Sequence, residues 1–429
     1  MEKPVLQVAL DLMNLHRALQ IAEEAVDGGV DWIESGTLLI KSEGIESVRA
    51  LKARFPEKVI VADLKTADVG GVEVEMASKA GAQVCIVLGI SDDGTISEAV
   101  RAGRKYGSKV MVDLLGVHDK LERAKELQAM GVDFICVHVG IDEQMTGGTP
   151  FDLVRELAQS VDIPIAAAGG LNTENAAQAL KAGASIIIVG GAITKAADVT
   201  GETKKLKEAI IEEKSIPTEL FKKYSGEELY DVFSKVSTSN ISDAMHRKGV
   251  LVGLKPIKKG FKLVGRAVTV RTYDGDWAKP VEAIDSADKG EVIVIDACRG
   301  RTAVWGELAS WSCKKKGIAG VVIDGAARDV EDILDMDFPV FARHFVPNAG
   351  EPKGFGEIGA EIVCGGLCIR QGDWIIGDDS GVVVVPKDRA REIANRAMDV
   401  REHENRIREE IKRGSTLSEV IKLKKWEKK

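Results

Sequence analysis

Five carboxylates, one lysine and one histidine stand at or just after the ends of short apolar runs in the first half of the chain. The set comprises Asp11, Glu34, Asp63, Lys65, Asp68, Asp113 and His138. These residue types bind metals, transfer protons and stabilise negative charge. One carboxylate in such a place is often a helix N-cap, and for Asp113 a cap and a site role are both compatible with the sequence. Five converging acids would repel one another, so the set indicates a bound cation or a cationic partner.

Two glycine pairs, Gly169-Gly170 and Gly190-Gly191, follow the last two apolar runs of this half. Glycine lets the backbone approach a ligand, and backbone N–H groups at a helix start bind phosphate. Glycines also end strands for structural reasons alone, but two pairs in successive loops favour a phosphate site. The expected substrate is therefore a small phosphorylated metabolite.

The elements that must position these residues alternate between strand and helix eight times. Strands are expected at 5–10, 30–33, 59–62, 84–88, 110–112, 134–137, 163–168 and 185–189. Nearly continuous apolar strands separated by helices predict a parallel sheet, and eight units close a TIM (β/α)8 barrel. An open doubly wound sheet would need a glycine-rich turn after its first strand, where the sequence reads Ala9-Leu10-Asp11-Leu12. In a barrel, residues past the strand ends share one rim.

Asp63 and Lys65 end the third expected strand, so alternation places both on the same side, toward the barrel axis. Together with Glu34 on the neighbouring strand, Asp63 predicts a two-carboxylate Mg²⁺ site that leaves positions for substrate oxygens. Such a site suits an enediolate. A barrel lysine could instead form a Schiff base with a ketone, but Asp63 and Asp68 favour a protonated Lys65.

The N-terminal motifs resemble those of 3-hexulose-6-phosphate synthase, a member of the orotidine 5′-monophosphate decarboxylase superfamily. They are Leu6-Gln7-Val8-Ala9-Leu10-Asp11, Glu34, the Asp63-x-Lys65-x-x-Asp68 motif and the run from Val137-His138 to Gln144. The resemblance covers residues 1 to about 210. It implies a Mg²⁺-dependent aldol reaction in which ribulose 5-phosphate and formaldehyde give D-arabino-hex-3-ulose 6-phosphate.

Carried over by position, the resemblance implies that Glu34 and Asp63 are the metal ligands. Asp11 and Asp68 would lie near the metal and the substrate hydroxyls, and the rim glycines would bind the phosphate.

The same resemblance implies that Lys65 stabilises the developing oxyanion and that His138 moves the proton at C1. A related enzyme, 3-keto-L-gulonate 6-phosphate decarboxylase, shares this scaffold and typically carries an arginine shortly after the histidine. Here Val139-Gly140-Ile141 follows His138, which favours the aldolase over the decarboxylase.

A charged and polar stretch from Lys195 to Tyr224 separates the two halves, with a boundary expected near Ser215–Pro217. Later strands are expected at 261–271, 291–295, 319–323, 339–342 and 381–385. Their irregular spacing predicts a mixed α/β domain rather than a second barrel. The expected division is a barrel at 1–214, a second domain at 217–390 and a charged helical tail at 391–429.

Arg328 and Asp329 form an adjacent pair after an apolar run in the second half. Arginine matches a carboxylate bidentately and aspartate can hold a divalent metal, although a surface ion pair or helix cap would use the same residues. This half resembles the regulators of ribonuclease activity A and their relatives, the 4-hydroxy-4-methyl-2-oxoglutarate aldolases and oxaloacetate decarboxylases. The resemblance rests on Asp324-Gly-Ala-Ala-Arg328-Asp329 and on Glu307, which twenty intervening residues separate from Arg328 and where the aldolases have aspartate.

For the second half, the resemblance implies metal ligands at Glu307 and Asp329 and a catalytic role for Arg328 in a 2-keto acid lyase. A non-catalytic regulator or oligomerisation module is the alternative.

Composition narrows the class of protein. The length of 429 residues indicates two domains, and a composition of 45% hydrophobic and 29% charged residues is typical of folded protein. The net charge of −8 disfavours nucleic-acid binding. No apolar run approaches the roughly 20 residues of a membrane helix, so a cytoplasmic protein without a membrane partner is expected. Its expected partners are a phosphorylated sugar, formaldehyde, a 2-keto acid and further copies of itself. The basic tail has apolar residues at helical spacing, which favours a packed or oligomer-facing helix over an RNA-binding arm.

Overall fold

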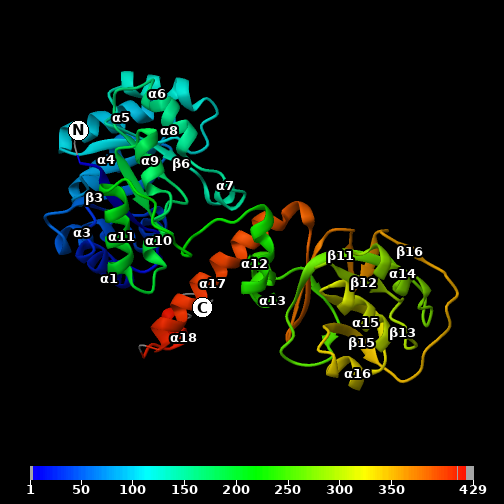
Figure 1. Cartoon of the computed structure of the whole chain (residues 1–429). Helices are drawn as coiled ribbons and strands as arrows, with labels where there is room; N and C mark the ends of the chain where they lie inside the picture. The colour runs from blue at the N-terminus through cyan, green and yellow to red at the C-terminus, as the bar shows by residue number, and fades with distance from the viewer. Residues whose placement is uncertain (1–2, 413, 422–429) are drawn as a thin grey trace. The chain divides into compact units, whose positions relative to one another are not determined.

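The computed structural model describes residues 3–412 and 414–421 of the chain. They form two compact units (Figure 1). The first unit contains the residues up to Lys223 and those from Glu402 onward, and the second is Tyr224–Arg401. Among the described residues, none of the helices combines the length and the apolar character needed to cross a bilayer.

Eight parallel strands close the first unit into a barrel in sequence order. Strand β1 pairs with β2 on one side and with β8 on the other, so the sheet closes on itself. The strands are β1 (Val5–Leu10), β2 (Trp32–Ser35), β3 (Val59–Thr66), β4 (Val84–Leu88), β5 (Lys109–Asp113), β6 (Phe134–His138), β7 (Ile165–Ala168) and β8 (Ile186–Val189). The predicted TIM barrel is confirmed, and each expected strand overlaps an observed one.

Amphipathic helices cover the outside of this barrel (Figure 1). Helix α1 buries Ala18, Ile21, Ala22 and Ala25 at helical spacing, and the Asn14 side chain caps it by accepting the N–H of Arg17. The helices are α1 (Leu15–Asp27), α2 (Thr37–Glu43), α3 (Glu46–Arg54), α4 (Gly70–Lys79), α5 (Asp93–Tyr106), α6 (Lys120–Ala129), α7 (Ile141–Met145), α8 (Phe151–Ala158), α9 (Ala176–Ala182), α10 (Gly191–Thr194) and α11 (Val199–Ile211).

Apolar side chains fill the barrel. Val61, Met111 and Ile188 belong to the cluster inside it, and a larger cluster that includes Leu10 and Ile21 lies between strands and helices. Burial at about 25 cal/mol per Å² of apolar surface makes these clusters the main stabilising contribution.

The second unit is built on a mixed sheet, as predicted. Four parallel strands lie in the order β15, β14, β12, β11, antiparallel β10 borders β15, and antiparallel β19, β20 and β9 extend the other side. The strands are β9 (Val250–Leu251), β10 (Lys255–Pro256), β11 (Leu263–Arg271), β12 (Val292–Asp296), β13 (Ala303–Trp305), β14 (Gly320–Ala327), β15 (Val340–Phe345), β16 (Glu357–Ile358), β17 (Ile362–Cys364), β18 (Leu367–Ile369), β19 (Trp374–Asp378) and β20 (Gly381–Val385).

Short helices accompany this sheet, and two further helices follow its last strand in the described part of the chain. They are η1 (Gly226–Glu228), α12 (Leu229–Lys235), α13 (Thr238–Ala244), α14 (Ala278–Ser286), α15 (Glu307–Lys316), α16 (Val330–Asp335), η2 (Lys387–Arg389), α17 (Ala390–Lys412) and α18 (Leu417–Val420). Within the expected tail, Ile393 and Ala397 are buried in a core cluster of the second unit, whereas residues from Glu402 belong to the first. Residues 413 and 422–429 of that tail lie outside the described part of the chain.

The first unit also extends beyond the expected boundary, to Lys223. Its last residues stay on the barrel because Ile216 N–H donates to the carbonyl of Thr173 at 2.9 Å and Leu220 packs against the outer apolar cluster.

Candidate active site

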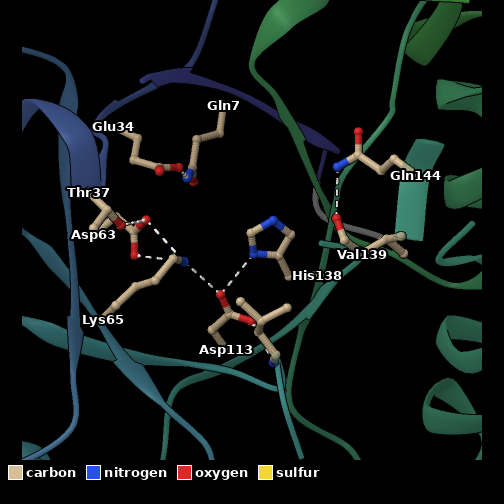
Figure 2. A network of polar contacts seen from close by, with 10 residues as sticks. Gln7, Glu34, Thr37, Asp63, Lys65, Asp113, His138, Val139 and Gln144 are labelled. Atoms are coloured by element: carbon tan, nitrogen blue, oxygen red, sulfur yellow. Dashed lines mark hydrogen bonds and ion pairs between the residues drawn. The ribbon is translucent and has the colours of Figure 1, made fainter. Parts of the chain in front are cut away.

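Four neighbouring or nearby strands bring the predicted polar residues to the carboxyl rim of the barrel (Figure 2). Glu34 lies in β2, Asp63 and Lys65 lie in β3, Asp113 ends β5 and His138 ends β6. Parallel strands of a closed barrel all end at the same rim. Side chains as far apart in sequence as Glu34 and His138 therefore lie in one region.

The end of β3 departs from a regular strand. Its register against β4 shifts between Asp63 and Thr66, which is a β-bulge, and Lys65 has a φ of 47°. A left-handed backbone is uncommon for a residue with a Cβ, and such conformations cluster at functional sites. Simple alternation therefore does not explain why Asp63 and Lys65 share a side. The bulge turns the backbone, and Lys65 Nζ then lies 3.3 Å from Asp63 Oδ1.

Lys65 bridges two carboxylates. Its Nζ lies 3.2 Å from Asp63 Oδ2 and 2.9 Å from Asp113 Oδ2. Burial by itself would lower the pKa of Lys65, but the negative charges of Asp63 and Asp113 outweigh burial and raise that pKa. The side chain is therefore an ammonium ion at neutral pH and not a free amine.

Asp113 belongs to the same network. Its Oδ2 also lies 3.0 Å from His138 Nδ1, and its Oδ1 accepts the N–H of Leu115 at 2.9 Å. Burial by itself would raise the pKa of Asp113, but His138 and Lys65 lower it to about 2. Because an ionised carboxylate only accepts hydrogen bonds, His138 donates its Nδ1–H, which leaves Nε2 as the acceptor of the neutral ring.

Glu34 and Asp11 add negative charge beside Asp63. Glu34 is 4% exposed and accepts a hydrogen bond from Gln7 Nε2 at 2.6 Å. Burial, then the charges of Asp63 and Asp11, raise the pKa of Glu34 well above its ordinary value. Asp11 packs against Gly36 at the mouth, and partial burial and then Asp63 raise the pKa of Asp11. The charges of Asp63 and Asp11 therefore disfavour the ionised form of Glu34, and the charge of Asp63 disfavours that of Asp11.

This excess of negative charge fits a divalent cation. Within residues 3–412 and 414–421, no group of three or more His, Cys, Asp or Glu side chains forms a complete metal cage. Mg²⁺ does not need one, because one or two carboxylates, water and substrate oxygens usually hold it. Asp63 Oδ2 accepts a hydrogen bond from Thr37 Oγ1 at 2.6 Å, which fixes the orientation of that carboxylate.

Asp68 lies outside this network. It is exposed, and its Oδ1 accepts the N–H of the next residue, Val69, at 2.7 Å. Within the described residues of one chain, no contact of Asp68 therefore supports its expected place near the metal.

The two glycine pairs follow β7 and β8 at the same rim, but for different reasons. Gly169 and Gly170 have φ values of 99° and 71°, which by themselves favour glycine. For Gly190 the nearest atom to an added Cβ would be the carbonyl oxygen of Ala9 at 3.8 Å, so the protein leaves room for a side chain. Gly191 begins α10, whose first N–H groups have no acceptor inside the helix.

In the second unit, Glu307, Arg328 and Asp329 also lie together. Asp329 Oδ2 lies 3.2 Å from Arg328 Nε and accepts the N–H of Glu307 at 3.1 Å. One carboxylate oxygen thus caps the first turn of α15, as the capping interpretation expects. A cavity of about 390 Å³ lies beside the pair, lined by Asp329, Val330, Glu331, Asp332, Phe345, Val346 and Pro347.

Comparison with known proteins finds a match for each half. Residues 4–206 match the family described as Orotidine 5′-phosphate decarboxylase / HUMPS family, and residues 238–384 match the RraA-like family, described as Aldolase/RraA. The chain is 39% identical over 208 residues to the 3-hexulose-6-phosphate synthase of Bacillus subtilis (strain 168), which covers 48% of this chain and 99% of that protein. Through its barrel, the chain belongs to the HUMPS family.

Two further relatives match the same half of this HUMPS-family chain. The 3-hexulose-6-phosphate synthase of Mycobacterium gastri is 40% identical over 205 residues, covering 48% of this chain and 99% of that protein. A crystal structure of 3-hexulose-6-phosphate synthase is 40% identical and covers 48% of this chain and 99% of its own, with a TM-score of 0.46. The predicted fusion of a HUMPS-family barrel with an RraA-like domain is confirmed.

Gln7 and Thr37 are two residues of this polar network to which the sequence motifs assigned no role. A signal for Gln7 is present in the sequence, because it is the polar residue inside the apolar run Val5–Leu10. Its Oε1 is buried without a hydrogen-bond partner in the described residues. For Thr37 the sequence carries no comparable signal.

The crowded carboxylates predict that Glu34→Gln stabilises the metal-free protein. The pKa of Glu34 is raised on folding, so its ionised form costs stability once the pH exceeds the unfolded-state value. One pKa unit corresponds to about 1.4 kcal/mol, and we expect a gain of at least about 1 kcal/mol at pH 7.5 that vanishes near pH 4. Urea unfolding of EDTA-treated protein measures it.

Glu202→Gln is the matched control, since Glu202 is a buried glutamate 3.5 Å from Lys205 rather than beside other acids. It should give no gain. A Glu34→Gln protein no more stable than wild type at pH 7.5 would contradict the electrostatic account.

Proposed function

We propose that the barrel is a Mg²⁺-dependent aldolase that interconverts ribulose 5-phosphate plus formaldehyde with D-arabino-hex-3-ulose 6-phosphate. The observation that carries this proposal is the protonated Lys65 held between Asp63 and Asp113, with Asp113 also paired to His138. It combines an oxyanion partner and a proton acceptor beside a cluster of carboxylates. Relatives 39% and 40% identical that are named 3-hexulose-6-phosphate synthase support the same reaction.

Glu34 and Asp63 would hold the metal. Bound Mg²⁺ would supply positive charge that favours the sugar enediolate. Gln7 and Thr37 orient these two carboxylates by donating hydrogen bonds to Glu34 Oε2 and Asp63 Oδ2. Asp11, at the mouth, is the further acid proposed to face the substrate hydroxyls.

His138 is the proposed proton carrier. Because Asp113 accepts its Nδ1–H, Nε2 is available to remove the proton at C1 of ribulose 5-phosphate. The electron pair at C1 then forms the bond to the formaldehyde carbon, and the former aldehyde oxygen takes up a proton as it becomes a hydroxyl. Lys65 donates an N–H to the sugar oxygen on which negative charge develops.

The substrate phosphate is proposed to bind at Gly169-Gly170 and Gly190-Gly191. Both pairs follow strand ends at the rim that carries Lys65, and the room beside Gly190 leaves its backbone approachable. The first N–H groups of α10 supply donors without intrahelical acceptors.

The decarboxylase alternative has less support. Val139-Gly140-Ile141 follows His138 without an arginine, and the curated relatives described above are named as synthases.

For the second unit we propose a metal-dependent lyase that acts on a 2-keto acid. Arg328 would bind the substrate carboxylate, and Glu307 and Asp329 would hold the metal next to the 390 Å³ cavity. The match of residues 238–384 to the Aldolase/RraA family supports this class. A non-catalytic binding or oligomerisation module is the second candidate, favoured by the capping contact between Asp329 and the Glu307 N–H.

We also propose that the chain forms a homo-oligomer. Val69, Val72 and Met76, at and just before α4, are 56%, 67% and 43% exposed. Apolar side chains gathered on one helix are typical of a surface that another copy covers.

The barrel proposal predicts that the whole chain, given ribulose 5-phosphate, formaldehyde and Mg²⁺, forms a six-carbon phosphorylated ketose detectable by mass spectrometry. EDTA should abolish the reaction and excess Mg²⁺ should restore it. Because Lys65 is protonated, borohydride with ribulose 5-phosphate should trap no adduct; a mass increase on Lys65 would show Schiff-base chemistry and overturn this mechanism.

Asp113→Asn should lower kcat about 100-fold with a small change in KM, because His138 loses the carboxylate that sets its tautomer and Lys65 loses a counter-charge. Asp31→Asn is the matched control: Asp31 also pairs with a lysine, Lys207, and accepts a backbone N–H, that of Leu6, but precedes β2 at the opposite rim. Equal losses of kcat in the two variants would show that Asp113 contributes only to the stability of the fold.

Oxaloacetate turnover by the whole chain with Mg²⁺ tests the second unit. The assay is made in a Lys65→Ala background, so that the barrel contributes nothing. Asp329→Ala should then abolish pyruvate release, since it removes a proposed metal ligand. Absence of turnover in the Lys65→Ala parent, with unchanged behaviour on Asp329→Ala, would favour the non-catalytic module.

A further inference from the structure

The segment of residues 216–223, here called the connector, lies against the loop that follows β7. Ile216 N–H donates to the Thr173 carbonyl at 2.9 Å, and Thr173 Oγ1 donates to the Ile216 carbonyl at 2.8 Å. Thr218 N–H points to Glu174 Oε1 at 3.4 Å. Thr173 and Glu174 lie in the loop that begins with Gly169-Gly170, so the connector is fastened to the first glycine pair's own loop.

The connector also contacts the second glycine loop, through Phe221. A Cβ added to Gly191 would overlap the Phe221 ring, and the three nearest heavy atoms would all be carbons of that ring. The backbone of Gly191 is therefore packed directly against the Phe221 ring. Lys195 and Lys223 place their ammonium groups 5.2 Å and 4.1 Å from the ring centroid. Phe221 itself has a φ of 56°, a conformation kept only where its surroundings hold it.

The second half of α17 also contacts the connector. Phe221 N–H donates to Glu402 Oε1 at 2.9 Å. Farther along the helix, Glu410 lies 3.0 Å from Arg17 of α1 and 3.2 Å from Arg406, which is 9% exposed. The connector thus contacts both a helix anchored to the barrel and the two glycine loops.

The connector and α17 both lie beyond residues 4–206, the part of the chain that matches the HUMPS family. The connector's contacts on the glycine loops, and the contact of α17 on the connector, are thus made by chain outside the family match.

We propose that the connector is a brace that holds the loops at 169–175 and 190–195, the second of which contains the short helix α10, in their phosphate-binding shape, with Phe221 as the positioning residue. The functional part rests on the proposed sugar-phosphate substrate, whereas the mechanical part, the ordering of both loops, does not. Phe221 touches no reacting atom and acts through the backbone of Gly191. Glu402 acts one step farther out, through the N–H of Phe221.

Hydrogen–deuterium exchange of the full chain tests the mechanical part without any substrate. In Phe221→Ala, the amides of 169–175 and 190–195 should exchange about tenfold faster than in wild type. Phe55→Ala is the matched control: Phe55 is 8% exposed, packs against the same apolar cluster and has a cation, Arg54, 5.9 Å from its ring, but follows α3 at the opposite rim. Unchanged exchange of both loops in Phe221→Ala, or equal acceleration in Phe55→Ala, would overturn the brace.

Steady-state kinetics test the functional part. Phe221→Ala should raise KM for ribulose 5-phosphate about tenfold with kcat within about twofold, the pattern of a lost contribution to substrate binding. Phe221→Tyr keeps the ring and should retain the wild-type KM, and Glu402→Gln should raise KM less than Phe221→Ala does. A fall in kcat at constant KM would overturn the assignment of Phe221 to phosphate binding.

A double-mutant cycle identifies the contact itself. Gly191→Ala should raise KM strongly in the wild-type background, because the new methyl group displaces Phe221, and much less in Phe221→Ala, where the space is free. Additive effects would overturn the role of this contact. If wild type does not turn over ribulose 5-phosphate, the proposed function falls, and the exchange experiment still decides whether the brace exists.

Discussion

The active rim of the barrel depends on the ammonium group of Lys65. Asp63 and Asp113 flank it, and burial, followed by the charge of nearby Asp63, raises the pKa values of Glu34 and Asp11. Removing Lys65 would leave buried carboxylates facing one another, and an unpaired buried charge costs several kcal/mol. The left-handed backbone of Lys65 costs on the order of 1–3 kcal/mol. Two charge-assisted contacts offset that cost, so the bulge persists because the site holds it.

How much of this arrangement the sequence predicts depends on the kind of residue. Apolar β-branched runs and the rule that parallel strands share a carboxyl rim suffice to bring Asp63, Asp113 and His138 together. The bulge at Lys65 is not predictable, because alternation assumes regular φ and ψ values. The partner of Asp113 is not predictable either. A helix cap and a residue of a polar network would both be an aspartate at this strand end.

In the second unit the same limits apply to short elements. The buried parallel strands were predictable from their apolar runs, but two-residue strands such as β9 and β10 have no periodicity to detect. The rule that site residues follow the carboxyl ends of parallel strands also points to Arg328 and Asp329 after β14. Their side chains, however, are 43% and 30% exposed. An exposed ion pair contributes little stability and is screened by solvent. Charge alone therefore distinguishes this pair poorly from a cap, whereas burial makes the Lys65 network specific.

For glycine, the sequence says least about why that residue type is required at its position. At Gly169 and Gly170 the positive φ suffices, while at Gly191 the reason is an aromatic ring that arrives from thirty residues later in the chain. Ordering the connector costs about 1–2 kcal/mol of backbone entropy per residue, so it stays in place only through the contacts it makes with the loops and with α17. Coupling of this kind is reciprocal: if the connector favours the phosphate-binding shape of the loops, bound phosphate must favour the docked connector to the same degree. The segment that joins the two units would then be a participant in substrate binding and not only a tether.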